Sequence, residues 1–394
     1  IMVINVIKLS NQRENNGVYL AVSINNTQVP IPSDQAAKLI ELHPQNMEQF
    51  WMSEYIKSNM FEHYDNKGYN FALREELIEE SNDYLRGISD LFLKDAYIED
   101  YVKTIFQGIA PKRFNNKRPE YANLKIIQSP TPYANMLANG TLLISTGLLT
   151  TVDSVEELTA VIASGISHYV MDHPLINVRK EIARVRRAEF WGGFMVAVAG
   201  GLEIALTENN DNYIPGGILL TAAVADEALN YSATKRLGMG YNDKQRNMAD
   251  QIAVDFLKFA NMDPAALTSA LTKIRNYYQR EYQYNNDDEK TFGNLNQRLA
   301  NLGDGKDFNN RTYQKIMANV TTLNAIIHLN SQNYEAARRL ANKKINTNLA
   351  TDEDYVVLVK ANMQLSNTQE ANERCLELIQ EGKAISEIPN LELY

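Results

Sequence analysis

The run that most constrains the fold of this chain spans residues 123–173, where apolar residues dominate. Within it, the segments NLKIIQSP and TLLIST favour two short strands, because each is rich in strand-forming residues and turn formers separate them. Asp153 or Ser154 can then cap a helix whose first turn holds two glutamates, where carboxylates interact well with the helix dipole. That helix is expected to run to about His173, because Pro174 follows it. The run therefore predicts strand, turn, strand and one long helix.

Outside this run, strand patterns occur at the start of the chain. Residues 1–31 contain the segments VINVIKL and GVYLAVSI, and ENNG between them has the Asn-Gly chemistry of a hairpin turn. Apolar residues recur at helical spacing over about 34–107 and again over about 244–283. These patterns predict an α+β, mostly α, chain.

The C-terminal part is predicted to form helical pairs, RTYQKIMANVTTLNAIIHLNSQ with NYEAARRLANKKI, then EDYVVLVKANMQLS with NTQEANERCLELIQEGKAI. Each pair is close to the ~34-residue period of tetratricopeptide hairpins. Two pairs are fewer than a free-standing solenoid needs, so we expect them to pack on the preceding domain. The predicted domains are an N-terminal β-hairpin extension over 1–33, a central domain over 34–305 and tetratricopeptide-like helical hairpins over 306–394.

Composition excludes some classes of function. The net charge of −9 argues against nucleic-acid binding, which needs an excess of Lys and Arg. Cys375 is the only cysteine, so no disulfide within the chain and no cysteine-based zinc cluster can form.

The chain begins at Ile1, as expected for a processed or trimmed product. The apolar stretches 190–202 and 214–225 are shorter than the ~18–20 residues that span a bilayer, so we expect buried helices, with peripheral membrane contact as the alternative.

Three separated motifs between about Tyr101 and Leu302 carry a resemblance to a known family. They are IIQSPTPYANMLANGTLLISTGLLTTVDSVEELTAVIASGISHYVMDH, GYNDKQRNMADQIAVDFLKFANMDPAAL and TFGNLNQRLANL. Their order and spacing resemble the zinc metallopeptidase family numbered forty-eight. That family includes CAAX prenyl endopeptidases and periplasmic proteases with tetratricopeptide repeats. The resemblance implies a zincin-like domain over 34–305.

The chemistry of that family depends on an HExxH helix. Two histidines at i and i+4 share one helix face and bind zinc, and the glutamate between them activates the zinc-bound water. A glutamate from a downstream helix is the third ligand, followed by an aspartate that supports the site and by a later histidine. In this sequence the first ligand position holds Ser164, the base position Gly165 and the second ligand position His168. The third ligand position holds Arg246, the aspartate is Asp250, and Phe292 stands at the position of the later histidine.

The replacements predict a degenerate site in which HExxH has become SGISH. Ser164 is a poor neutral zinc ligand, Gly165 has no side chain to move a proton, and Arg246 brings a permanent positive charge. No metal is therefore expected, unless other ligands rebuild a zinc site around His168. A hydrogen bond between Ser164 and His168 is possible at i, i+4 spacing, but no orienting acid or oxyanion hole for a Ser/His nucleophile pair is identified.

The remaining histidines offer no clear substitute ligand. His168 and His173 are five residues apart, roughly 140° around a helix, so they are not expected to face one point. His173 is predicted to be a structural cap and His168 a buried hydrogen-bonding residue. His43 and His63 are predicted to lie in surface regions or loops, and His328 to pack between helices.

Peptide binding at this type of site does not require zinc. In the family, an edge strand beside the active-site helix holds extended substrate by strand addition, which needs backbone groups but no metal. The matching positions here are Thr141, Leu142, Leu143, Ile144, Ser145 and Thr146. Arg246 is expected to add a contact to a carboxylate or carbonyl of the bound segment.

The leading functional hypothesis is an inactive metallopeptidase-like protein that binds extended peptide or protein partners, as a chaperone or adaptor does. The first alternative is an active zinc metalloendopeptidase with unconventional ligands. The second is a structural subunit that pairs with an active paralogue through the apolar stretches at 190–202 and 214–225. The resemblance to periplasmic members suggests an extracytoplasmic location, such as a bacterial periplasm.

Overall fold

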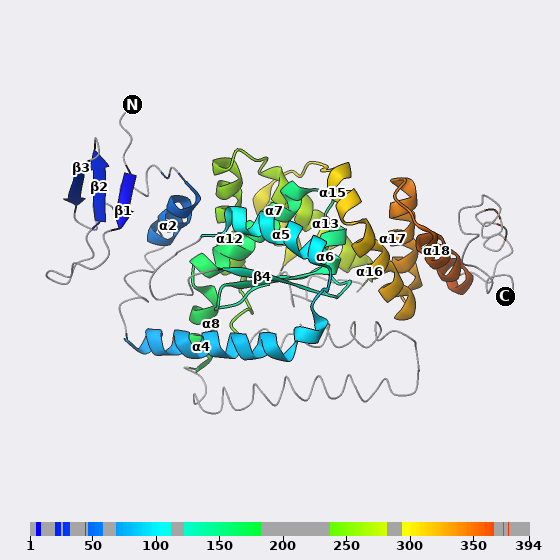
Figure 1. Cartoon of the computed structure of the whole chain (residues 1–394), viewed down its shortest axis with the longest axis horizontal. Coiled ribbons are helices and arrows are strands. Elements are labelled where there is room, and N and C mark those ends of the chain that lie inside the picture. Colours follow the sequence, from blue (N-terminus) through cyan, green and yellow to red (C-terminus); the bar gives the residue numbers. More distant parts are fainter. Residues whose placement is uncertain are drawn as a thin grey trace.

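The computed structural model describes residues 5–8, 20–24, 27–31, 44, 46–57, 68–111, 122–182, 237–281, 294–365, 373 and 377. The chain is α+β and mostly helical, as predicted (Figure 1). Several predictions lie outside the described residues: those for both apolar stretches, for the last predicted helix, and for His43, His63, Phe292 and Cys375.

The described strands are β1 (Asn5–Lys8), β2 (Leu20–Ile24), β3 (Thr27–Ile31), β4 (Asn123–Ile127), β5 (Ala134–Met136) and β6 (Thr141–Ser145). The first helices are α2 (Met47–Lys57), α4 (Gly68–Gly87), the 3-10 turn η1 (Ser89–Leu91) and α5 (Ala96–Ile109). The central helices are α6 (Thr146–Thr151), α7 (Val155–Val170), α8 (His173–Ile182), α12 (Asp243–Phe259), α13 (Ala265–Glu281) and α14 (Leu295–Leu302). The last helices are α15 (Arg311–Ile316), α16 (Ala318–Asn330), α17 (Tyr334–Asn346) and α18 (Asp352–Leu365).

The central sheet has the order β4-β6-β5, with β6 parallel to β4 and antiparallel to β5. Its middle strand is covered on both faces, because Leu142 and Ile144 belong to one hydrophobic cluster and Leu143 to another. This two-sided burial explains why TLLIS is a continuous apolar run rather than an alternating one. Figure 1 shows α5 and α7 on one side of this sheet and α4 and α8 on the other.

The sheet order corrects one prediction. Because β6 lies between β4 and β5, both of its edges are already hydrogen-bonded, so a peptide cannot add to Thr141–Thr146 as a new strand. The outer strand on the side of α7 is β5, which the sequence suggested was only a turn. Its three residues are too few to show a strand pattern.

The N-terminal strands form a three-stranded antiparallel sheet, β1-β2-β3, rather than a two-stranded hairpin. The third strand contains Pro30, and proline is tolerated at a sheet edge, which is where β3 lies.

The C-terminal helices pack on the central domain, as predicted. Asn324 Nδ2 on α16 donates to Thr150 Oγ1 at 2.9 Å, and Tyr313 Oη on α15 donates to the Leu149 carbonyl at 2.9 Å. Helices α16 and α18 begin 34 residues apart, at Ala318 and Asp352, which agrees with the expected period. The tetratricopeptide-like assignment and the boundary at residue 305 stay predictions. Within the described ranges, no helix is long and apolar enough to cross a membrane.

Candidate functional site

Helix α7 carries three of the predicted site positions. Ser154 caps it by accepting a hydrogen bond from Glu157 N at 3.2 Å, so the predicted capping at this end is confirmed for the serine. Nearly every residue from Glu157 onward is buried, because α7 runs between the sheet and α12 and α13. The helix therefore holds Ser164, Gly165 and His168 in the interior of the domain.

The two histidines near the end of α7 meet, contrary to the prediction. His168 Nδ1 lies 2.8 Å from His173 Nδ1, and both side chains are buried. The prediction was wrong because it continued one helix through both residues, whereas α7 ends at Val170 and His173 starts α8. Between them, Asp172 adopts a left-handed conformation with φ 57°, which turns the chain back.

A buried ion pair stabilises this turn. Arg74 on α4 donates from Nη1 to Asp172 Oδ1 at 2.7 Å, and its Nη2 contacts the other carboxylate oxygen. Both side chains are at most 8% exposed, so the contact is shielded from water. His173 is thus held against His168 by a residue 98 positions away from Asp172 in the sequence.

The histidine pair has to be uncharged at neutral pH. Burial lowers the pKa of His173 to about 3. Burial, then the neighbouring His173 and the guanidinium of Arg246, lower the pKa of His168 well below its usual value. In the contact between the two rings, one Nδ1 must donate and the other must accept, which fits two neutral imidazoles.

Tyr241 covers the other side of His168. Its ring stacks on the imidazole with centroids 3.6 Å apart and an interplanar angle of 16°. Its hydroxyl donates to the Met136 carbonyl on β5 at 2.9 Å. Arg246 Nε donates to the Tyr241 carbonyl at 3.1 Å, so the arginine at the third-ligand position is fixed beside the same tyrosine.

Asp250 occupies the centre of a charged network. Arg298 on α14 donates from Nε to Asp250 Oδ2 at 2.7 Å and from Nη2 to Asp250 Oδ1 at 2.6 Å. Ser164 Oγ donates to Asp250 Oδ1 at 3.1 Å. The serine at the first-ligand position is therefore bound to a carboxylate, which in turn neutralises one of two buried guanidinium groups.

The second guanidinium lies close to the first. Arg246 is 5% exposed, and burial together with the nearby Arg298 lowers its pKa to about 10. The carboxylates of Asp250 and Asp243 act in the opposite direction, so acidic side chains of this chain balance part of the charge of Arg246.

Close packing surrounds the glycine at the base position. A Cβ atom on Gly165 would lie 2.8 Å from Leu142 Cδ1, closer than real Cβ contacts allow. Any side chain there would require the leucine on β6 to shift. The cavity in front of this helix holds about 20 Å³, roughly one water molecule, and Ala134, Asn135 and Met136 of β5 form one of its walls.

These side chains do not fit a zinc ion. Ser164 donates to Asp250, and Arg246 is a cation where the ion would need an anion. Among the described residues, no group of three His, Cys, Asp or Glu side chains is arranged to hold a metal. Ser164 and Arg298 are both bound to Asp250, and the cavity that they line with His168 and Arg246 has room for about one water molecule.

Sequence reasoning identified Ser164, Gly165, His168, Arg246 and Asp250, and the fold brings them together. It missed Tyr241 and Arg298. Arg298 stands in the quoted motif TFGNLNQRLANL, but nothing in that motif indicated that it pairs with Asp250 on α12. Tyr241 precedes the motif helix α12 and carried no signal before its contact with His168 was known.

Comparison with known families identifies the central domain. A family model described as peptidase family M48 matches residues 97–304, slightly more than half of the 394 residues. A comparison with curated proteins gives no match. The matched range contains the sheet, α7, α12 and α14, which together build the site. The chain therefore belongs to peptidase family M48.

Proposed function

We propose that this chain is an M48 member that no longer hydrolyses peptides and instead binds an extended protein segment. The observation that supports this most is that Ser164, at the first-ligand position, donates to Asp250, while the third-ligand position holds the buried Arg246, so neither residue offers a ligand to zinc. Peptide binding by the family's strand-addition mode needs backbone groups and no metal.

The absence of bound zinc is the first point to test. Protein purified without chelators is analysed by elemental mass spectrometry, with His168→Ala as the comparison. We expect a zinc-to-chain ratio near zero for both proteins and no chelator-sensitive cleavage of unfolded casein. A ratio near one in the parent chain that falls in His168→Ala would refute the loss of the metal site.

The binding surface in this proposal is the outer edge of β5, which replaces the β6 edge ruled out by the sheet order. Two features support it. The edge forms one wall of the cavity that also contains Arg246, and among the described strands β5 pairs only with β6. The Tyr241 hydroxyl donates a hydrogen bond to the Met136 carbonyl at this edge, so it competes with an incoming strand for that acceptor.

This competition provides a sharp test. Tyr241→Phe keeps a ring to stack on His168 but frees the Met136 carbonyl, so an extended peptide should bind more tightly to the variant. Tyr278→Phe is the matched control, since its hydroxyl also donates to a backbone carbonyl, that of Pro132, at 2.7 Å. Binding of a peptide library is measured by fluorescence anisotropy up to ~100 μM.

The expected result is a gain in affinity for Tyr241→Phe and none for Tyr278→Phe. No binding by any protein in the series, or equal gains in both variants, would contradict strand addition at β5.

The location of repeat-bearing family members supports an extracytoplasmic compartment, such as a bacterial periplasm. Cell fractionation of a tagged chain would test it.

A further inference from the structure

A second cleft lies away from the family's site, between α13 and the C-terminal helices. Its inner part is a cavity of about 270 Å³, and its outer part is an open hollow of about 710 Å³. Arg280, Arg339 and Lys343 line both parts, so the two are continuous. The cleft therefore joins the peptidase-like domain to the helices that pack on it.

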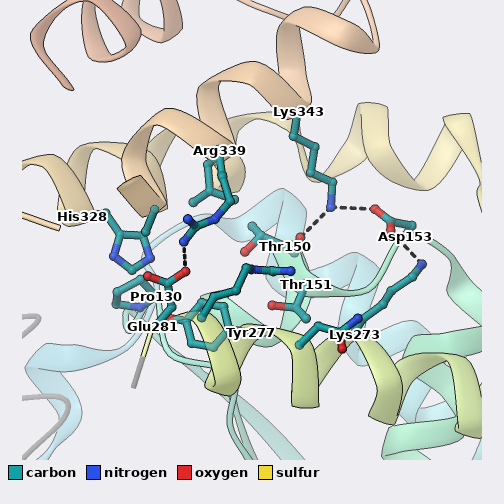
Figure 2. A pocket seen from close by; sticks show the side chains of 14 residues that line it. Pro130, Thr150, Thr151, Asp153, Lys273, Tyr277, Glu281, His328, Arg339 and Lys343 are labelled. Carbon is teal, nitrogen blue, oxygen red and sulfur yellow. Dashed lines mark hydrogen bonds and ion pairs between the residues drawn. The ribbon is translucent and has the colours of Figure 1, made fainter. Parts of the chain in front are cut away.

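The inner part has its charges compensated. Figure 2 shows Asp153 between two lysines: Lys343 Nζ lies 2.6 Å from Asp153 Oδ1, and Lys273 Nζ lies 2.7 Å from Asp153 Oδ2. On the opposite side of the view, Arg339 pairs with Glu281. These ion pairs hold α17 against α13 and the loop before α7. They leave little charge for a ligand at the bottom of the cleft.

The outer part is lined by four cationic side chains and by no acidic residue; the cations are Arg280, Arg338, Arg339 and Lys343. Arg339 and Lys343 have the partners just named, and Arg338 pairs with Glu335 at 2.7 Å. Because the Arg338–Glu335 pair is exposed and contributes little, a ligand carboxylate can replace Glu335 at small cost. Three of them lie on α17, where Arg339 and Lys343 share one helix face at i, i+4 spacing and Arg338 directly precedes Arg339. Arg280 is exposed and has no ion-pair partner within the described ranges, although it is close enough to Arg339 to oppose that residue's charge.

The outer wall also has groups that suit a peptide backbone. Asn342 and Asn346 lie on the same helix as the cations, and a carboxamide can both donate to and accept from a peptide bond. A hollow of about 710 Å³ is larger than a single small anion needs. Nucleic acid is disfavoured because the chain as a whole carries a charge of −9, which repels a long polyanion.

We propose that the outer cleft between α13 and α17 binds an extended, acidic segment of a protein partner. The aspartate or glutamate carboxylates contact Arg280 and Arg338 at the rim, and the carboxamides of α17 contact the backbone. This site is distinct from the β5 edge, so it does not depend on the function proposed for the family's site.

The test uses a fluorescein-labelled eight-residue peptide that alternates Asp and Glu, with an Asn/Gln peptide of the same length as the uncharged comparison. The proteins are the full chain, Arg280→Gln, Arg338→Gln and the double variant. Both arginines are at the surface, so their replacement leaves the core unchanged. Arg86→Gln is the matched control, because its side chain is 74% exposed on α4, outside the cleft.

We expect the acidic peptide to bind the full chain and to lose affinity by about fivefold for each arginine replaced, as for an exposed ion pair. The double variant should lose about 25-fold if the two effects add. Arg86→Gln should bind like the parent chain, and Tyr241→Phe should leave this binding unchanged. Equal binding of the uncharged peptide, unchanged affinity in the double variant, or tighter binding of single-stranded RNA than of the acidic peptide would each overturn the proposal.

Discussion

Replacing Asp250 by asparagine tests whether the charged network stabilises the core. The substitution keeps the shape of the side chain but removes the charge that neutralises Arg298. The two side chains are 3% and 6% exposed, so water cannot take over that role. Removing one partner of a buried ion pair typically costs about 3–5 kcal/mol, because the other charge stays buried without compensation. Arg246 is buried nearby, so the substitution also removes a carboxylate that acts on its charge.

The assay is urea unfolding followed by tryptophan fluorescence, for which the fully buried Trp51 is an internal reporter. Asp255→Asn is the matched control on the same helix. Its side chain is 43% exposed and pairs with Lys258 at 3.2 Å, so its loss should cost no more than about 0.5 kcal/mol. Adding Arg298→Met to Asp250→Asn should restore part of the lost stability, because the unpaired charge is then gone.

Two results would refute this reasoning. A loss below about 1 kcal/mol in Asp250→Asn would mean that Arg298 is not dependent on this carboxylate. Equal losses in Asp250→Asn and Asp255→Asn would mean that burial does not distinguish the two ion pairs.

Three further predictions concern stability. Gly147→Ala should destabilise the chain by at least about 2 kcal/mol in urea unfolding, because its Cβ would lie 2.1 Å from a backbone oxygen; Gly108→Ala, with open space around it, should be neutral or slightly stabilising. The pKa values of His173 and His328 are lowered by burial to about 3 and about 4, so the unfolded state binds more protons below pH 6.5. The free energy of unfolding should therefore decrease as the pH is lowered, by about 2 kcal/mol per histidine at pH 5. A urea midpoint that does not change between pH 7 and pH 5 would contradict this. Lys344→Met should lower the free energy of unfolding by about 3–5 kcal/mol, because the fully buried carboxylate of Asp354, 2.6 Å from Lys344 Nζ, loses its ion-pair partner. A thermal melt like that of the parent chain would contradict this.

The sequence was a reliable guide wherever neighbouring residues decide the structure. The serine cap of α7, its acidic first turn and the apolar strands on either side of the turn are local features, and the fold has them. The family's motifs also depend on fixed spacing, so the positions Ser164, Gly165 and His168 could be assigned without a structure.

Contacts between distant segments could not be predicted in this way. His168 meets His173 because a left-handed Asp172, held by Arg74 from α4, ends one helix and starts another, whereas periodicity alone continues the first helix. The sheet order that makes β6 central depends on which strands pair, and strand patterns do not specify their partners.

The sequence by itself therefore determined the α+β class and the helix that carries the site, and it predicted the replacement of the family's metal-binding side chains. Only the tertiary structure decided what those side chains do now, because the Arg298–Asp250 pair, the tyrosine over the imidazole and the basic cleft all join segments far apart in the chain. Local preferences act over a few residues, but burial and charge pairing depend on the whole packed molecule.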